Sequence, residues 1–83
     1  MKVYIVIEIY FSEDGVRKEI KCVCKDKNTA KDKMKEYVKK QLEEQFEYED
    51  WAITTIEDDK YILDSVYESM EFRIKEFEVI WNR

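Results

Sequence analysis

The residues of this chain that could carry chemistry are two cysteines and several clustered carboxylates. Cys22 and Cys24 are separated by one residue, and the chain has no histidine. A zinc site built on these thiolates needs two further ligands, and the sequence offers no other cysteine and no imidazole. Ser–His and Cys–His nucleophile pairs are excluded, and the chain's one glycine cannot form a Gly-rich phosphate loop. The sequence therefore argues against an enzyme, and we expect no catalytic residues and no cofactor.

Carboxylate pairs are the remaining candidates for a bound ion. Asp58 with Asp59, or Glu43 with Glu47, offers the oxygen ligands that hard cations prefer. Neither pair has the ligand spacing of an EF-hand loop, so we expect no metal site. Cys22 and Cys24 would lie about 6.6 Å apart on a strand, near the upper limit for a disulfide. Two reduced thiols that fill the core are the expectation.

The charges of the chain are sorted into blocks. Residues 17–40 hold ten bases against four acids, a local charge of +6, whereas residues 43–59 hold eight acids and no base. In the first block, four lysines repeat at helical spacing and form a secondary basic face: Lys27, Lys31, Lys35 and Lys39. Such a row either contacts phosphates or is simply solvated. The solvated interpretation is favoured, and nucleic acid is disfavoured as a partner, because the acidic block would repel the same polymer.

The acidic block also contains three aromatic residues. Aromatic anchors inside a charged rim are typical of surfaces that dock onto another protein, here one with a basic groove. The other interpretation is a solvated loop. The residues of the predicted partner-binding surface are Glu43, Glu44, Phe46, Glu47, Tyr48, Glu49, Asp50, Trp51, Glu57, Asp58 and Asp59.

The first half of the chain predicts a hairpin followed by a helix. Alternating apolar residues indicate a strand over residues 2–11, and because its second face is also mostly apolar, we expect it to be central or covered on both sides. A turn over residues 12–15 with Gly15 leads to a second strand, residues 16–24, with Ile20, Cys22 and Cys24 on one face. Asp26 is the expected N-cap of a helix over residues 27–46.

The second half predicts further strands. Residues 51–56 are β-prone, residues 57–59 resemble a turn, and residues 60–66 fit a returning strand, although a four-residue apolar repeat leaves a helix open for residues 60–69. Residues 72–81 predict a final strand with a bulge at Lys75 and Glu76. We therefore expect one α+β domain over residues 1–83, with a mainly antiparallel sheet of four to five strands and one long helix on one face, in the order β-β-α-β-β-β.

Three segments carry a resemblance to a known family: KVYIVIEIYF, EIKCVCKDKNTAKDKM and FRIKEFEVI. Together they resemble a family of small uncharacterised hairpin–helix–strand domains found in phages and Gram-positive bacteria. The likeness covers about half the chain, and residues 45–71 depart from it as an insertion. The resemblance implies a fold and a phage or mobile-element setting, and it carries over no catalytic residues.

Size and charge complete the functional expectation. The chain has 83 residues, a net charge of −5 and no apolar run of the roughly 18 residues that a membrane span requires. We expect a cytoplasmic protein, in the host cell if phage encoded, without a membrane partner. The hypothesis is an acidic protein-binding inhibitor, of the anti-CRISPR or another anti-defence type, that occludes the basic nucleic-acid-binding groove of a host protein. The alternative is a self-associating structural or regulatory domain, a homodimer joined through charge pairing or edge strands.

Overall fold

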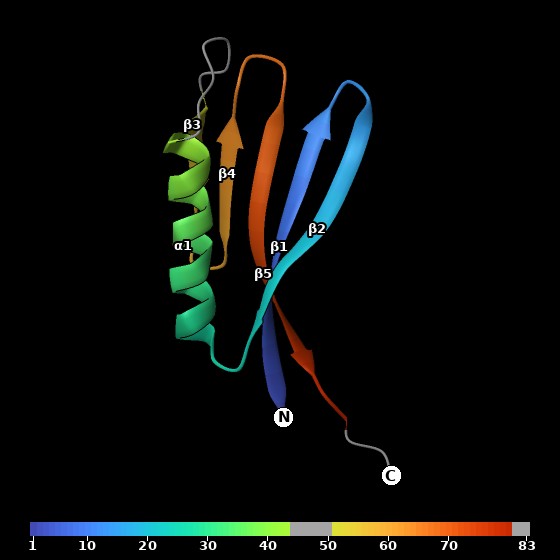
Figure 1. The fold of residues 1–83 in the computed structure, drawn as a ribbon, viewed down its shortest axis with the longest axis vertical. Helices are drawn as coiled ribbons and strands as arrows, with labels where there is room; N and C mark the ends of the chain where they lie inside the picture. Colours follow the sequence, from blue (N-terminus) through green and yellow to red (C-terminus); the bar gives the residue numbers. More distant parts are fainter. Residues whose placement is uncertain (44–50, 81–83) are drawn as a thin grey trace.

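The residues that the structure describes form a five-stranded antiparallel sheet with one helix packed on it. The structure is a computed structural model that describes residues 1–43 and 51–80. The elements are β1 (Lys2–Ser12), β2 (Gly15–Cys24), α1 (Lys27–Glu43), β3 (Ala52–Ile56), β4 (Lys60–Asp64) and β5 (Ser69–Glu78). The strand order in the sheet is β2-β1-β5-β4-β3, and α1 runs alongside the strands (Figure 1). The predicted α+β fold, its element order and its single helix are confirmed.

The first hairpin follows the predicted pattern closely. β1 pairs with both β2 and β5, so the prediction of a central strand is confirmed. Gly15 has a φ of 126°, a conformation that side chains disfavour, and the Ser12 hydroxyl accepts a hydrogen bond of 3.3 Å from the Asp14 amide. These local interactions close the turn where the sequence indicated it.

The start of α1 is capped by Asp26, as predicted. Its carboxylate accepts bonds of 2.8 Å from both the backbone amide and the hydroxyl of Thr29. These two hydrogen bonds lower the pKa of Asp26, because they stabilise the charged carboxylate. The apolar stripe of α1 places Ala30, Met34 and Val38 in the core. The predicted helix end at residue 46 lies outside the described residues.

The second hairpin decides between the two interpretations of residues 60–69. Residues 60–64 form β4, paired with both β3 and β5, so the strand prediction is confirmed there and the helix alternative is wrong. The turn is closed by the amide of Glu57, which donates to the Lys60 carbonyl at 2.8 Å. β4 ends earlier than predicted, because Ser65 and Glu68 form a turn that starts β5 at Ser69.

The predicted bulge at Lys75 and Glu76 is wrong. The register between β1 and β5 is continuous over the whole strand pair. Irregularities occur instead in the two edge pairings, opposite Val6 and Ile7 in β2 and between Ile53 and Thr55 in β3. Both edge strands therefore carry a bulge, whereas β5, between β1 and β4, pairs regularly.

The bulge in β2 also reverses one facing prediction. Val6 pairs with Cys22 and Ile7 pairs with Ile20, so Lys21 is the extra residue. A one-residue slip moves the side chains beyond it to the other face of the sheet. Cys24 is accordingly buried, whereas the Ile20 side chain, expected on the same face, is 63% exposed on the opposite face.

Candidate functional site

The predicted acidic surface lies partly outside the described residues. Glu44, Phe46, Glu47, Tyr48, Glu49 and Asp50 all belong to the undescribed segment. Three of the four described acids of the block contact bases of their own chain. The Asp58 carboxylate lies 2.7 Å from the Lys31 ammonium and 3.8 Å from the Lys27 ammonium. Glu43 lies 3.9 Å from Lys39, and Glu57 lies 3.5 Å from Lys60.

These ion pairs bring the basic face of α1 and the acidic turn together. The hydrogen bond and charge of Lys31 lower the pKa of Asp58, which is the expected effect of a neighbouring ammonium on a carboxylate. The basic and acidic blocks are thus not separated on the surface at this point, because Asp58 of the acidic block lies against Lys27 and Lys31 of the basic block. A partner that sought the acidic turn would compete with these lysines, so this part of the predicted docking surface is weakened as a binding site.

Trp51 also differs from the prediction. We expected its ring to be an anchor for a partner, but it is 5% exposed and belongs to the hydrophobic core. Its ring centroid lies 6.3 Å from that of Tyr10. A small domain gains more from burying a large aromatic side chain in its own core than from leaving it exposed to solvent.

The two cysteines are thiols packed against each other. Their Sγ atoms are 3.8 Å apart, and neither forms a disulfide. Burial, followed by the hydrogen bond between the two thiols, raises the pKa of Cys24, so this thiol stays protonated near neutral pH. Within residues 1–43 and 51–80, no three Cys, Asp or Glu side chains gather as a metal site. The pair acts as core packing, as the sequence indicated.

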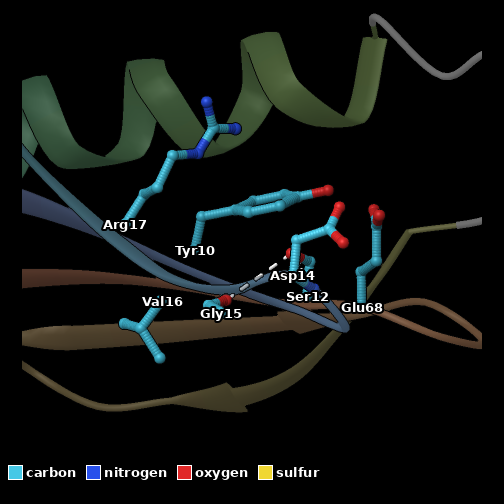
Figure 2. A pocket seen from close by; sticks show the side chains of 7 residues that line it. All are labelled: Tyr10, Ser12, Asp14, Gly15, Val16, Arg17 and Glu68. Atoms are coloured by element: carbon cyan, nitrogen blue, oxygen red, sulfur yellow. Dashed lines mark hydrogen bonds between the residues drawn. The ribbon is translucent and has the colours of Figure 1, made fainter.

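A depression of about 410 Å³ lies beside the first hairpin turn, lined by Tyr10, Ser12, Asp14, Gly15, Val16, Arg17 and Glu68. Figure 2 shows the Tyr10 ring in the middle, with Arg17 on one side and the carboxylates of Asp14 and Glu68 on the other. The guanidinium carbon of Arg17 is 5.2 Å from the ring centroid, a cation–π contact. The depression therefore brings together one guanidinium, one aromatic ring and two carboxylates.

The surface that stands out is the sheet face opposite α1. Cross-strand partners share a face, and the register joins Val3 to Phe77, Ile5 to Val23, Ile7 to Ile20 and Phe11 to Val16. None of these residues belongs to the hydrophobic core or packs against it. We call this surface the open face; it consists of Val3, Ile5, Ile7, Ile9, Phe11, Val16, Ile20, Val23 and Phe77.

The edges of the open face are polar and mainly basic. Lys18 lies opposite Ile9, and on the other flank Lys75 and Arg73 lie opposite Ile5 and Ile7. Arg73 also binds Glu71, with 3.2 Å between Nη2 and Oε1. An apolar centre with a polar rim is the usual anatomy of a protein interface.

The sequence contained one signal for the open face. Residues 2–11 are apolar on both faces, which indicates cover on both sides, yet one helix can cover only one face of a sheet. The contribution of Ile20 could not be predicted, because it depends on the bulge at Lys21.

No helix within the described residues is long and apolar enough to span a bilayer. No protein-family model, curated protein or solved structure matches the chain, so the resemblance to phage domains stays a prediction.

Proposed function

We propose that this chain is a protein-interaction domain and that the open face is its binding surface. The observation that carries the proposal is the position of five large apolar residues of β1 on a sheet face that no helix of residues 1–43 and 51–80 covers. Three flanking residues of β2 increase this surface: Ile20, Val23 and Val16 are 63%, 59% and 57% exposed. Contiguous apolar patches of this kind, as opposed to scattered apolar residues, mark interaction sites on soluble proteins.

The cost of leaving this face in water supports the same conclusion. Fully burying a Val, Ile or Phe side chain is worth about 1.5–3 kcal/mol. A domain of 83 residues has a total stability of only about 4–12 kcal/mol. Covering the exposed parts of several of these side chains would therefore contribute a free energy comparable with that stability, before the entropy cost of association is subtracted.

The acidic inhibitor stays a prediction of the sequence. Six of its eleven residues lie outside the described part of the chain, Trp51 is buried, and Asp58 is paired with Lys31. Nothing in the described residues adds support for it. The open face is therefore the better-supported binding surface.

Site-specific photo-crosslinking tests the proposal in cells of the organism that encodes the protein. A crosslinking amino acid at position 20 should capture a protein. The matched control is position 56, because Ile56 is also an exposed isoleucine of an edge strand, 66% exposed, but lies beside Lys31 and Met34 on the helix side. Equal capture at both positions, or none at position 20, would refute the open face as a binding surface.

A further inference from the structure

We infer that the partner of the open face is a second copy of this chain, packed sheet against sheet about a two-fold axis. The inference rests on the proposed function, and it names the occupant of that surface. The resulting homodimer would have four layers, with the two sheets inside and one α1 on each outer side. Four features of the described residues support a second copy.

The first feature is the size of the face. β1 has eleven residues, and β2 and β5 have ten each. At about 3.4 Å per residue and about 4.8 Å between strands, these three strands have a flat footprint on the order of 500 Å². Protruding side chains make the accessible surface larger than this footprint, so it approaches the roughly 800 Å² per partner of a standard interface.

The second feature is shape. Sheets twist with a fixed hand, and two packed sheets follow each other when their twists are alike. A sheet of ten-residue strands is a twisted surface that a flat partner cannot follow. A second copy has the same twist by identity, and aligned packing then lets the side chains of the two inner faces interdigitate.

The third feature is the pattern of side chains across the face. Consider a two-fold axis that lies between the two sheets and runs perpendicular to the strands at Ile7. It would stack Ile7 on Ile7 of the second copy and Ile5 on Ile9, because Ile5 and Ile9 lie two residues from Ile7 on the same face. On β5 the same operation places Lys75 over Glu71 of the second copy. Arg73 would lie near the axis with its own Glu71 3.2 Å away, so each Glu71 would be shared between its own Arg73 and Lys75 of the second copy.

The fourth feature is that two other ways of forming a homodimer, charge pairing between copies and strand addition at the edge of β2, are disfavoured. Lys27 and Lys31 are paired with Asp58 of their own chain, so they are less available for pairing charges between copies. β2 carries the bulge at Lys21, and two charged residues, Lys18 and Glu19, precede this bulge in the strand. Bulges and charges are the means by which natural sheets prevent strand addition.

The mass of the purified full chain in solution tests the inference. Sedimentation equilibrium and light scattering should give a dimer whose dissociation constant is unchanged or lower in about 1 M salt, since apolar burial is not screened. A dimer that salt dissociates would refute sheet packing in favour of charge pairing. A monomer at all concentrations up to about 1 mM would overturn the inference outright.

Two matched variants locate the interface. Ile20→Lys should weaken dimerisation at least roughly 100-fold, because two unpaired ammonium groups, one from each copy, would be buried in the interface. Ile56→Lys should leave the dissociation constant within about twofold, and circular dichroism should show both variants folded. Equal effects of the two substitutions would overturn the inference. A chain that is monomeric, yet is crosslinked through position 20 to a different protein, would refute the second copy and leave the proposed function standing.

Discussion

Deleting Lys21 tests how the bulge in β2 distributes side chains between the two faces. The pairs Val6–Cys22 and Ile7–Ile20 lie on either side of Lys21. Removing this residue should convert the bulge to regular pairing while every other residue keeps its partner and its face. The variant should therefore fold, with Cys22 on the helix side and Ile20 on the open face.

The expected loss of stability follows from the contacts of Lys21. Its ammonium lies 5.5 Å from the ring centroid of Tyr37, a cation–π contact worth about 0.5–1 kcal/mol. Its carbonyl accepts a long hydrogen bond of 3.4 Å from the Tyr37 hydroxyl, worth about 0.5–1 kcal/mol. The ion pair with Glu19 at 3.7 Å is exposed and adds little. The free energy of unfolding should fall by about 1–2 kcal/mol, which lowers Tm by roughly 5–15 °C.

Deletion of Val23 is the matched control. It shortens β2 equally, but regular pairing would then place Lys21 opposite the fully buried Val6, in the position that Cys22 now occupies, and would move Cys22 to the open face. The Lys21 ammonium would leave the Tyr37 ring for this more deeply buried position, which should lower the free energy of unfolding by more than about 3 kcal/mol. Urea unfolding followed by tryptophan fluorescence compares the two deletions. If the Lys21 deletion were as destabilising as the Val23 deletion, Lys21 would not be the extra residue and the placement of Ile20 would be wrong.

Three further predictions concern the core, the helix cap and the thiols. Phe72→Ala should lower the free energy of unfolding by about 3–5 kcal/mol in urea, because the ring is 1% exposed and stacks on Tyr37; a loss under about 1 kcal/mol would contradict its place in the core. Because the pKa of Asp26 is lowered in the fold, its cap stabilises the protein above the ordinary Asp pKa and is lost as pH falls through the lowered value. Asp26→Ala should therefore destabilise the protein at about pH 7 more than at about pH 2; an equal effect at both values would refute this account. Iodoacetamide should modify Cys22 before Cys24, which is buried and has a raised pKa, and peptide mass spectrometry showing the reverse order would contradict the described burial.

Sequence reasoning found those features that depend on near neighbours in the chain. The turn at Gly15 depends on one residue's conformation, and the cap at Asp26 depends on a residue three positions away, Thr29. Features that depend on distant residues were missed. The pairing of Asp58 with Lys31 joins residues 27 positions apart, and it needs the second hairpin to lie beside α1.

The position of the bulges was missed for a related reason. An alternating pattern shows which residues of a strand share a face, but an extra residue breaks that pattern only relative to the partner strand. Lys21 follows Ile20 without any local signal such as glycine. The irregular spacing at Lys75 is a local pattern, and it proved compatible with regular pairing to β1. Bulges thus belong to strand pairs, which a single strand's sequence does not define.

The two edges of the sheet and its open face are built in opposite ways. Both edge strands carry a bulge, near Lys21 in β2 and near Thr54 in β3, and bulges hinder the addition of a further strand. If both edges could pair, copies would add without limit and form a fibre, because such contacts do not close. Packing through the open face about a two-fold axis covers the apolar sheet face that α1 leaves uncovered among the described residues, and it stops at two copies. The arrangement of bulges and apolar residues therefore favours one closed assembly over open-ended growth.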